Sequence, residues 1–275
     1  MNNHLKTKET SETAEQQELN SLLLAEIKPE NPAMVNGQAI ASRLQARVAR
    51  SIENHAQLLT VRVKNGFWKN LKKGIRVKSL WNGPEGNSVL IEFAPGAALP
   101  VHRHHFLEEG VVLRGDLQMG DLKLTQFDYH VSPSGSRHER IWSKQGALAY
   151  LRGTALGNPS AVLRELVGGL LPIKGGIAKT VHATNQDWQE LQPGLFRKEL
   201  FNDGTLASYF YRLEPGASCE AHVHTQHEEC MMLSGEIFLG DILLREHDYQ
   251  FAPKGSYHGL TYTDVGALLF VRSAA

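Results

Sequence analysis

Two groups of histidine and glutamate residues recur in this chain with the same spacing. Each group contains a His-x-His pair, a glutamate four residues after the second histidine, and a third histidine that follows a Pro-x-Gly turn. The first group consists of His102, His104, Glu108 and His138. The second group lies 120 residues later and consists of His222, His224, Glu228 and His258. The sequence therefore offers two equivalent sets of four side chains that could each bind a metal ion.

The spacing within each group suits a metal site built on strands. Alternate residues of a strand point to the same face, so a His-x-His pair directs two imidazoles into one cavity. The glutamate and the distant third histidine could then complete the set of ligands. Three neutral imidazoles and one carboxylate suit iron, zinc, manganese, nickel or copper better than calcium or magnesium. We expect up to two divalent transition metals per chain, with free coordination positions for water, dioxygen or a chelating substrate.

The two groups lie in two copies of one domain. At an offset of 120 residues the chain aligns with itself without a gap, from about residues 60–155 to 180–275. Roughly a third of these positions are identical, and a period this long indicates duplicated domains rather than a solenoid. We predict an N-terminal extension at 1–57, domains at 58–156 and 178–275, and a linker at 157–177.

The elements that position these residues are predicted to be strands. Each copy contains short apolar or alternating runs that are broken by glycine, proline, asparagine and aspartate, which is typical of antiparallel strands in an all-β sandwich or barrel. The extension has a polar start that we expect to be disordered. An amphipathic helix is predicted at about 37–54, where apolar residues recur every four positions. They are Ile40, Leu44, Val48 and Ile52.

These motifs resemble those of the cupin superfamily. The first cupin motif, G(x)5HxH(x)3-4E(x)6G, fits both copies, and the second fits through PxGxxH, although Trp142 and Tyr262 replace its final asparagine. The resemblance implies two tandem cupin barrels, each a double-stranded β-helix or jelly roll, which together form a bicupin. The run VRVKNGFWKNLKKGIRVKSLW and the PxGSxH motif are similar to the cupin portion of ChrR-type anti-sigma factors and to related cupin dioxygenases.

The resemblance implies a metal-dependent dioxygenase, or a related lyase, that acts on a small chelating organic substrate. The ligand glutamates Glu108 and Glu228 would serve as bases if they leave the metal. The alternative is a ChrR-like sensor or regulatory protein that responds to a metal or a small ligand. Anti-sigma factors of this type bind their partner through a zinc module with an HxxxCxxC ligand set, and this chain has no cysteine before Cys219. We therefore do not expect this chain to act as an anti-sigma factor.

Composition limits the classes of partner. The chain has 275 residues, with 29 basic and 29 acidic side chains, so it has no overall positive field for nucleic acid or for a membrane surface. No apolar run is long enough to span a bilayer, and the N-terminus is too polar for a secretory signal. We expect a cytoplasmic protein whose partner is a small molecule. The paired domains leave both a monomer and a homodimer open.

The two predicted cavities differ. If Glu228 points inward, strand alternation sends Cys230 and Met232 inward as well, and their counterparts are Gly110 and Val112. We therefore expect a roomier cavity in the first copy and favour it as the substrate site. Glu109 and Glu229 follow the ligand glutamates and should be exposed or lie in an interface. Four histidines without a counterpart are expected to be surface or supporting residues rather than ligands: His105, His130, His227 and His247.

Overall fold

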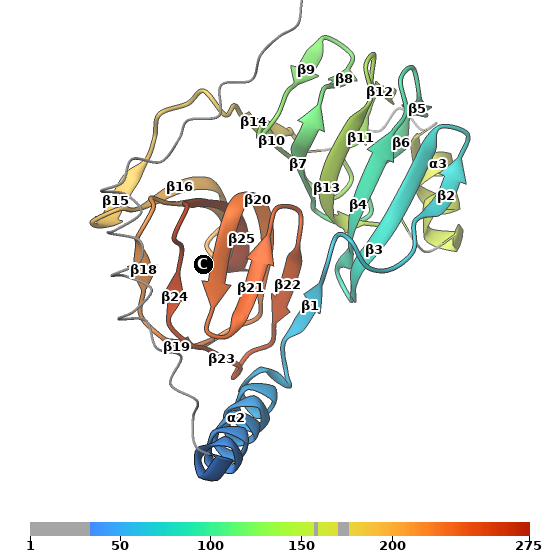
Figure 1. Ribbon diagram of the computed structural model, residues 1–275. Coiled ribbons are helices and arrows are strands. Elements are labelled where there is room, and N and C mark those ends of the chain that lie inside the picture. The colour runs from blue at the N-terminus through green and yellow to red at the C-terminus, as the bar shows by residue number, and fades with distance from the viewer. Residues whose placement is uncertain (1–33, 157–158, 170–175) are drawn as a thin grey trace, which may run out of the picture. The chain divides into compact units, whose positions relative to one another are not determined.

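The computed structural model of the chain describes residues 34–156, 159–169 and 176–275 (Figure 1). The chain divides into two compact units at the Ile52–Glu53 bond. Helix α2 (Met34–His55) lies at this division and begins three residues before the predicted helix. The four apolar residues of its predicted stripe are all exposed, from 48% for Val48 to 66% for Ile52. The segment that we expect to be disordered lies outside the described residues, and no described helix is long and apolar enough to cross a membrane.

The first repeat forms barrel 1, whose strands are all antiparallel. A large sheet has the order β14-β10-β7-β13-β4-β3-β2, in which β14 (Lys179–Val181) comes from outside the repeat, and smaller sheets have the orders β5-β12-β8-β9 and β11-β6. The strands of this repeat are β2 (Lys69–Lys72), β3 (Ile75–Gly83), β4 (Gly86–Phe93), β5 (Ala98–Leu99), β6 (His102–Arg103), β7 (Glu108–Gly115), β8 (Leu117–Met119), β9 (Leu122–Leu124), β10 (Tyr129–Ser132), β11 (Arg137–His138), β12 (Ile141–Trp142) and β13 (Ala147–Thr154).

The second repeat forms barrel 2 with the same arrangement, so the predicted all-β fold with two tandem barrels is confirmed. Its large sheet has the order β1-β22-β20-β25-β17-β16-β15, in which β1 (Leu59–Val61) comes from outside the repeat, and strands β19 and β23 form a separate pair. The strands are β15 (Gln189–Gln192), β16 (Leu195–Asn202), β17 (Leu206–Leu213), β18 (Ser218–Cys219), β19 (His222–Val223), β20 (Glu228–Leu239), β21 (Ile242–Arg245), β22 (Tyr249–Ala252), β23 (Tyr257–His258), β24 (Thr261–Tyr262) and β25 (Ala267–Ala274).

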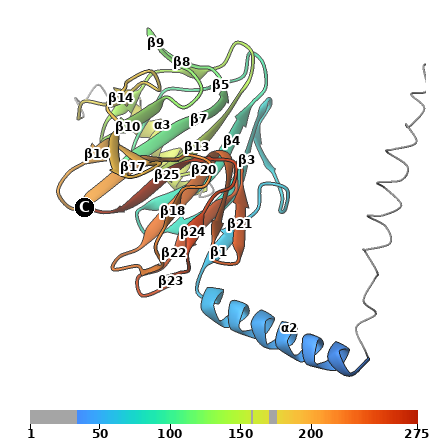
Figure 2. The same cartoon turned by 60° about the vertical axis from the view of Figure 1, so that its left-hand side comes forward.

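The two barrels exchange their first strands. Strand β1 (Leu59–Val61) precedes barrel 1 but pairs with β22 of barrel 2, whereas β14 (Lys179–Val181) precedes barrel 2 but pairs with β10 of barrel 1 (Figures 1 and 2). A buried lysine holds the chain after each exchanged strand. The amine of Lys78 donates to the Val63 carbonyl at 2.7 Å, and that of Lys198 donates to the Asn185 carbonyl at 2.9 Å. These acceptors offset the cost of burying an ammonium group.

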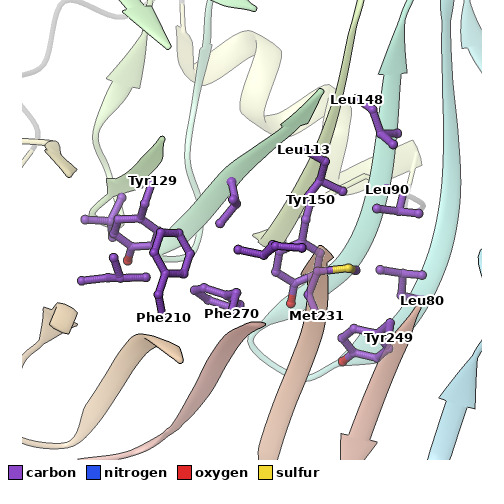
Figure 3. Packing of buried hydrophobic residues seen from close by; sticks show 14 of the residues in the cluster. Leu80, Leu90, Leu113, Tyr129, Leu148, Tyr150, Phe210, Met231, Tyr249 and Phe270 are labelled. Carbon is purple, nitrogen blue, oxygen red and sulfur yellow. The ribbon is translucent and has the colours of Figure 1, made fainter. Parts of the chain in front are cut away.

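A single hydrophobic cluster joins the two barrels. It contains Tyr129 and Tyr150 from barrel 1 and Met231, Tyr249 and Phe270 from barrel 2, all of them fully buried (Figure 3). The rings of Tyr150 and Phe270 lie 5.5 Å apart, a separation typical of packed aromatic pairs. Because both barrels contribute to this cluster, each of them depends on the other for part of its core.

Two ion pairs cross the same contact. Arg272 Nε of barrel 2 donates to Glu109 Oε2 of barrel 1 at 2.7 Å, and Arg152 Nε of barrel 1 donates to Glu229 Oε1 of barrel 2 at 2.9 Å. All four side chains are buried. Of the two placements expected for Glu109 and Glu229, the interface is therefore confirmed.

Helix α3 (Pro159–Gly169) follows barrel 1 and packs beside β6. Two arginines satisfy carbonyl groups at the end of the helix. Arg103 Nε donates to the Gly168 carbonyl at 3.1 Å, and Arg137 Nε donates to the Gly169 carbonyl at 2.8 Å. The last carbonyls of a helix lack partners within the helix and carry partial negative charge, so cationic donors there are stabilising.

Candidate metal centre

The structure brings together all four residues of the first group. Strands β6 and β11 pair so that His138 lies opposite His102, His104 follows β6, and Glu108 begins β7. One ligand atom from each of these four residues lies within 4.8 Å of the others. Local strand geometry thus delivers the two close histidines, and strand pairing delivers the third.

Three buried nitrogens of this group have no hydrogen-bond partner among the described residues. They are Nδ1 and Nε2 of His104 and Nδ1 of His138. Buried polar atoms are nearly always paired, so unsatisfied nitrogens in one cluster fit a set of metal ligands. Burial lowers the pKa of His104 to about 4 and that of His138 to about 2. Both imidazoles are therefore neutral near pH 7, which is the state that binds a metal.

Neighbouring groups orient two of these ligands. Nδ1 of His102 donates to the Pro100 carbonyl at 3.0 Å, and Ser132 Oγ lies 2.5 Å from Nε2 of His138. Partners of this kind hold the imidazole rings of metal sites in a fixed orientation. Glu108 is also buried, and this burial raises the pKa of its carboxyl group.

The second group is less complete. His222, His224 and His258 lie with one ligand atom each within 4.8 Å of the others, but the carboxylate of Glu228 is not part of this cluster. Glu228 Oε2 lies 3.8 Å from His224 Nδ1. Burial raises the pKa of Glu228 to about 7. The structure therefore brings together the three histidines of the second set and leaves its glutamate beside them.

The imidazoles of barrel 2 also satisfy one another. Nε2 of His258 donates to Gln250 Oε1 at 2.7 Å, which leaves Nδ1 of His258 to accept from His224 Nε2 at 3.0 Å. In barrel 1 the position of Gln250 is occupied by His130, whose Nδ1 lies 2.8 Å from Thr180 Oγ1 on the exchanged strand β14. The two sites thus have equivalent sets of three histidines. They differ in the residue next to the third histidine, which is His130 in barrel 1 and Gln250 in barrel 2.

A cavity of about 310 Å³ adjoins the first site. His102, Glu108 and His138 line it, and so does Gly110, as expected for a roomier first barrel. In barrel 2, Cys230 points inward as predicted and is buried in the core cluster. Burial raises the pKa of its thiol, so this group stays protonated.

Beside the predicted ligands, the cavity is lined by His130, which we expected to be a surface or supporting residue, and by Ser132 and Glu165, which the sequence patterns did not single out. His130 and Ser132 are on β10, and Glu165 is on α3, where its Oε1 accepts a hydrogen bond from the backbone nitrogen of His105 at 3.0 Å. Burial raises the pKa of Glu165 to about 7. A signal for His130 was its mismatch with Gln250 between the repeats. Glu165 has no counterpart in the second copy, so the repeat carried no signal for it.

The sequence profile of the ChrR cupin-like domain matches residues 56–156 and again residues 178–275. The chain belongs to the ChrR cupin-like family. Both matched segments contain a complete set of the predicted ligands, so family membership covers both barrels of this bicupin. Among curated proteins, none matches the sequence.

Solved structures share the fold at low sequence identity. A proposed dioxygenase from Nostoc punctiforme has a TM-score of 0.58 and 16% identity, with 79% of this chain and 82% of that chain covered. A variant of the Bacillus subtilis oxalate decarboxylase has a TM-score of 0.55 and 19% identity, with 78% and 76% covered. AerE from Microcystis aeruginosa has a TM-score of 0.53 and 17% identity, with 76% and 96% covered. At these identities the similarity concerns the fold alone.

Proposed function

We propose that barrel 1 binds a divalent transition metal and that the protein is a metal-dependent dioxygenase, or a related lyase, for a small chelating organic substrate. The observation that carries this proposal is the convergence of His102, His104, Glu108 and His138 next to the cavity, with unsatisfied imidazole nitrogens facing one another. A proposed dioxygenase and oxalate decarboxylases share this fold, so the fold is compatible with this class of chemistry.

The chain's own residues have separate tasks in this proposal. A bound metal would supply Lewis acidity and open positions for oxygen ligands. Pro100 and Ser132 hold the rings of His102 and His138. Glu108 is the proposed base, because its buried carboxylate takes up a proton at a higher pH than an exposed one does. The apolar wall of the cavity keeps water away from the reacting group.

Barrel 2 is the proposed second metal site. Its three clustered histidines could hold an ion, and a rotation of the Glu228 side chain would let this glutamate join them as ligand and base. The neutral charge balance of the chain supports a small-molecule partner rather than nucleic acid or a membrane, and we propose a cytoplasmic location.

Metal analysis and oxygen consumption test this proposal. Protein purified without a metal-affinity tag should contain a transition metal, and His104→Ala should remove the ion of barrel 1 while the matched His224→Ala variant retains it. Turnover of small diketones, flavonols and thiols should then consume oxygen in the wild type and in His224→Ala but not in His104→Ala. A chain that takes up no metal on reconstitution refutes the proposal. Retained metal without turnover of any substrate favours a sensor instead.

A further inference from the structure

At three equivalent positions the interior of barrel 1 has a smaller residue than the interior of barrel 2. Barrel 1 has small residues there, and all three line its cavity: Gly110, Val112 and Ala149. Barrel 2 has larger residues, and all three are buried in its core cluster: Cys230, Met232 and Leu269. Because each replacement adds side-chain atoms that point into the barrel, these three side chains of barrel 2 occupy positions that in barrel 1 line a cavity of about 310 Å³.

The cavity of barrel 1 is polar at one end and apolar over the rest of its wall. Three of the proposed ligands, His102, Glu108 and His138, form the polar end together with His130 and Ser132. Aliphatic and aromatic side chains form much of the remaining wall, among them Ile91, Phe93, Leu117 and Leu124. Of the described residues that line the cavity, Lys72 is the sole lysine or arginine, whereas both Glu108 and Glu165 contribute carboxylates. Because Lys72 is exposed, a second anionic group on a ligand would have no buried counter-charge, which is costly.

Helix α3 closes this cavity with the same mixture of side chains. Val162 and Leu166 add apolar surface, and Glu165 adds a polar group. The carbonyls at the end of the helix are held by Arg103 and Arg137. The equivalent positions in barrel 2 carry Val223 and Tyr257, which have no guanidinium group to donate and are exposed. The two arginines that hold a covering helix are therefore present in barrel 1, which has the cavity, and are absent from the equivalent positions of barrel 2.

We propose that barrel 1 takes a ligand of roughly a dozen heavy atoms in all, with one oxygen-bearing end directed at the histidines and an apolar body. This inference rests on the proposed function, because the oxygen-bearing end is the part that would meet the metal. The size follows from the volume: a cavity of about 150 Å³ holds the six carbons of benzene, so about twice that volume holds about twice as many atoms. A small dianion such as oxalate would leave the apolar part of the cavity unfilled.

A homologous series of ligands tests the apolar body directly. Binding of alkane-2,3-diones with about four to ten carbons is measured by calorimetry on the full chain loaded with zinc. Each added methylene group should tighten binding about fourfold until the cavity is full, after which the affinity should level off. Oxalate should bind more weakly than the eight-carbon dione. An affinity that does not change with chain length, or tighter binding of oxalate, overturns the inference.

Variants that carry the residues of barrel 2 locate the effect. The triple variant Gly110→Cys, Val112→Met and Ala149→Leu should bind zinc like the wild type and lose the dependence on chain length. In the single variant Ala149→Leu the affinity should level off at a shorter chain length. This variant keeps the test informative where the triple variant does not fold. Leu113→Met is the matched control, because Leu113 is on the same strand but packs in the cluster between the barrels. A triple variant that folds and retains the full dependence contradicts the assignment.

The metal-free protein separates this inference from the proposed function. The apolar wall does not depend on the metal, so the roughly fourfold step per methylene should persist in metal-free protein even where overall binding is weaker. A persistent step without metal uptake or oxygen consumption refutes the proposed function and leaves the ligand class standing. An affinity that does not change with chain length, together with oxygen consumption, refutes the proposed ligand class and leaves the proposed function standing.

Discussion

The ion pair between Glu109 and Arg272 should contribute strongly to the contact between the barrels. Glu109 is 0% exposed and Arg272 is 8% exposed, and the N–O distance is 2.7 Å. In Arg272→Met the carboxylate of Glu109 would keep the hydroxyl of Tyr129 at 2.7 Å but would lose its arginine. Breaking a buried pair by removing one partner costs about 3–5 kcal/mol, because the remaining charge stays desolvated.

We expect Arg272→Met to lower the free energy of unfolding by about 4 kcal/mol. The arginine is also a secondary partner of Glu229 at 3.7 Å, but Glu229 retains Arg152 at 2.9 Å, so most of the loss should arise at Glu109. For a folded unit of this size, about 1 kcal/mol shifts the melting temperature by about 2–4 °C. The expected decrease in melting temperature is therefore about 8–16 °C, measured by calorimetry or circular dichroism near pH 7.

An exposed ion pair in the same barrel provides the control. Arg245 Nε lies 3.3 Å from Glu236 Oε2, with side chains 61% and 33% exposed, so Arg245→Met should cost less than about 1 kcal/mol. The double variant Glu109→Gln and Arg272→Met should recover part of the loss, since it no longer buries an unpaired charge. If Arg272→Met is no more destabilising than Arg245→Met, the argument from burial is refuted.

Three further predictions concern the site and its helix. In metal-free protein the site histidines should lower the unfolding free energy as the pH falls below about 6.5, because the pKa values of about 4 for His104 and about 2 for His138 make the unfolded chain bind more protons. The raised pKa values of Glu165 and Glu228, both about 7, act in the opposite sense, so the histidine contribution is measured as the difference between the wild type and His104→Ala in urea titrations at pH 7 and pH 5; a difference that does not change with pH would contradict this. Zinc at about 100 times its dissociation constant for barrel 1 should raise the free energy of unfolding of the wild type by about 2.7 kcal/mol. In His104→Ala the contribution of barrel 1 to this increase should be lost, as measured by urea titration with and without zinc. Arg103→Ala should speed hydrogen exchange in α3, whereas Val223→Ala should leave this exchange unchanged.

Local patterns predicted much of the fold and of the first site. The His-x-His pair converges because alternate strand residues share a face, and the third histidine joins because β11 pairs with β6. The same rule placed Cys230 inside barrel 2, and it turned Glu109 away from the site into the contact between the barrels. The positions of these residues could be predicted because the repeat and the strand alternation are both visible in the sequence.

The sequence by itself determined the duplicated β architecture, the family resemblance and the histidines that converge, because all of these depend on spacing within a short stretch or on the repeat. Only the tertiary structure decided the exchange of β1 and β14, the position of Glu228 outside the histidine cluster, and the addition of Glu165 to the cavity. Each of these depends on packing between segments that are distant in sequence, and spacing along the chain carries no information about such packing.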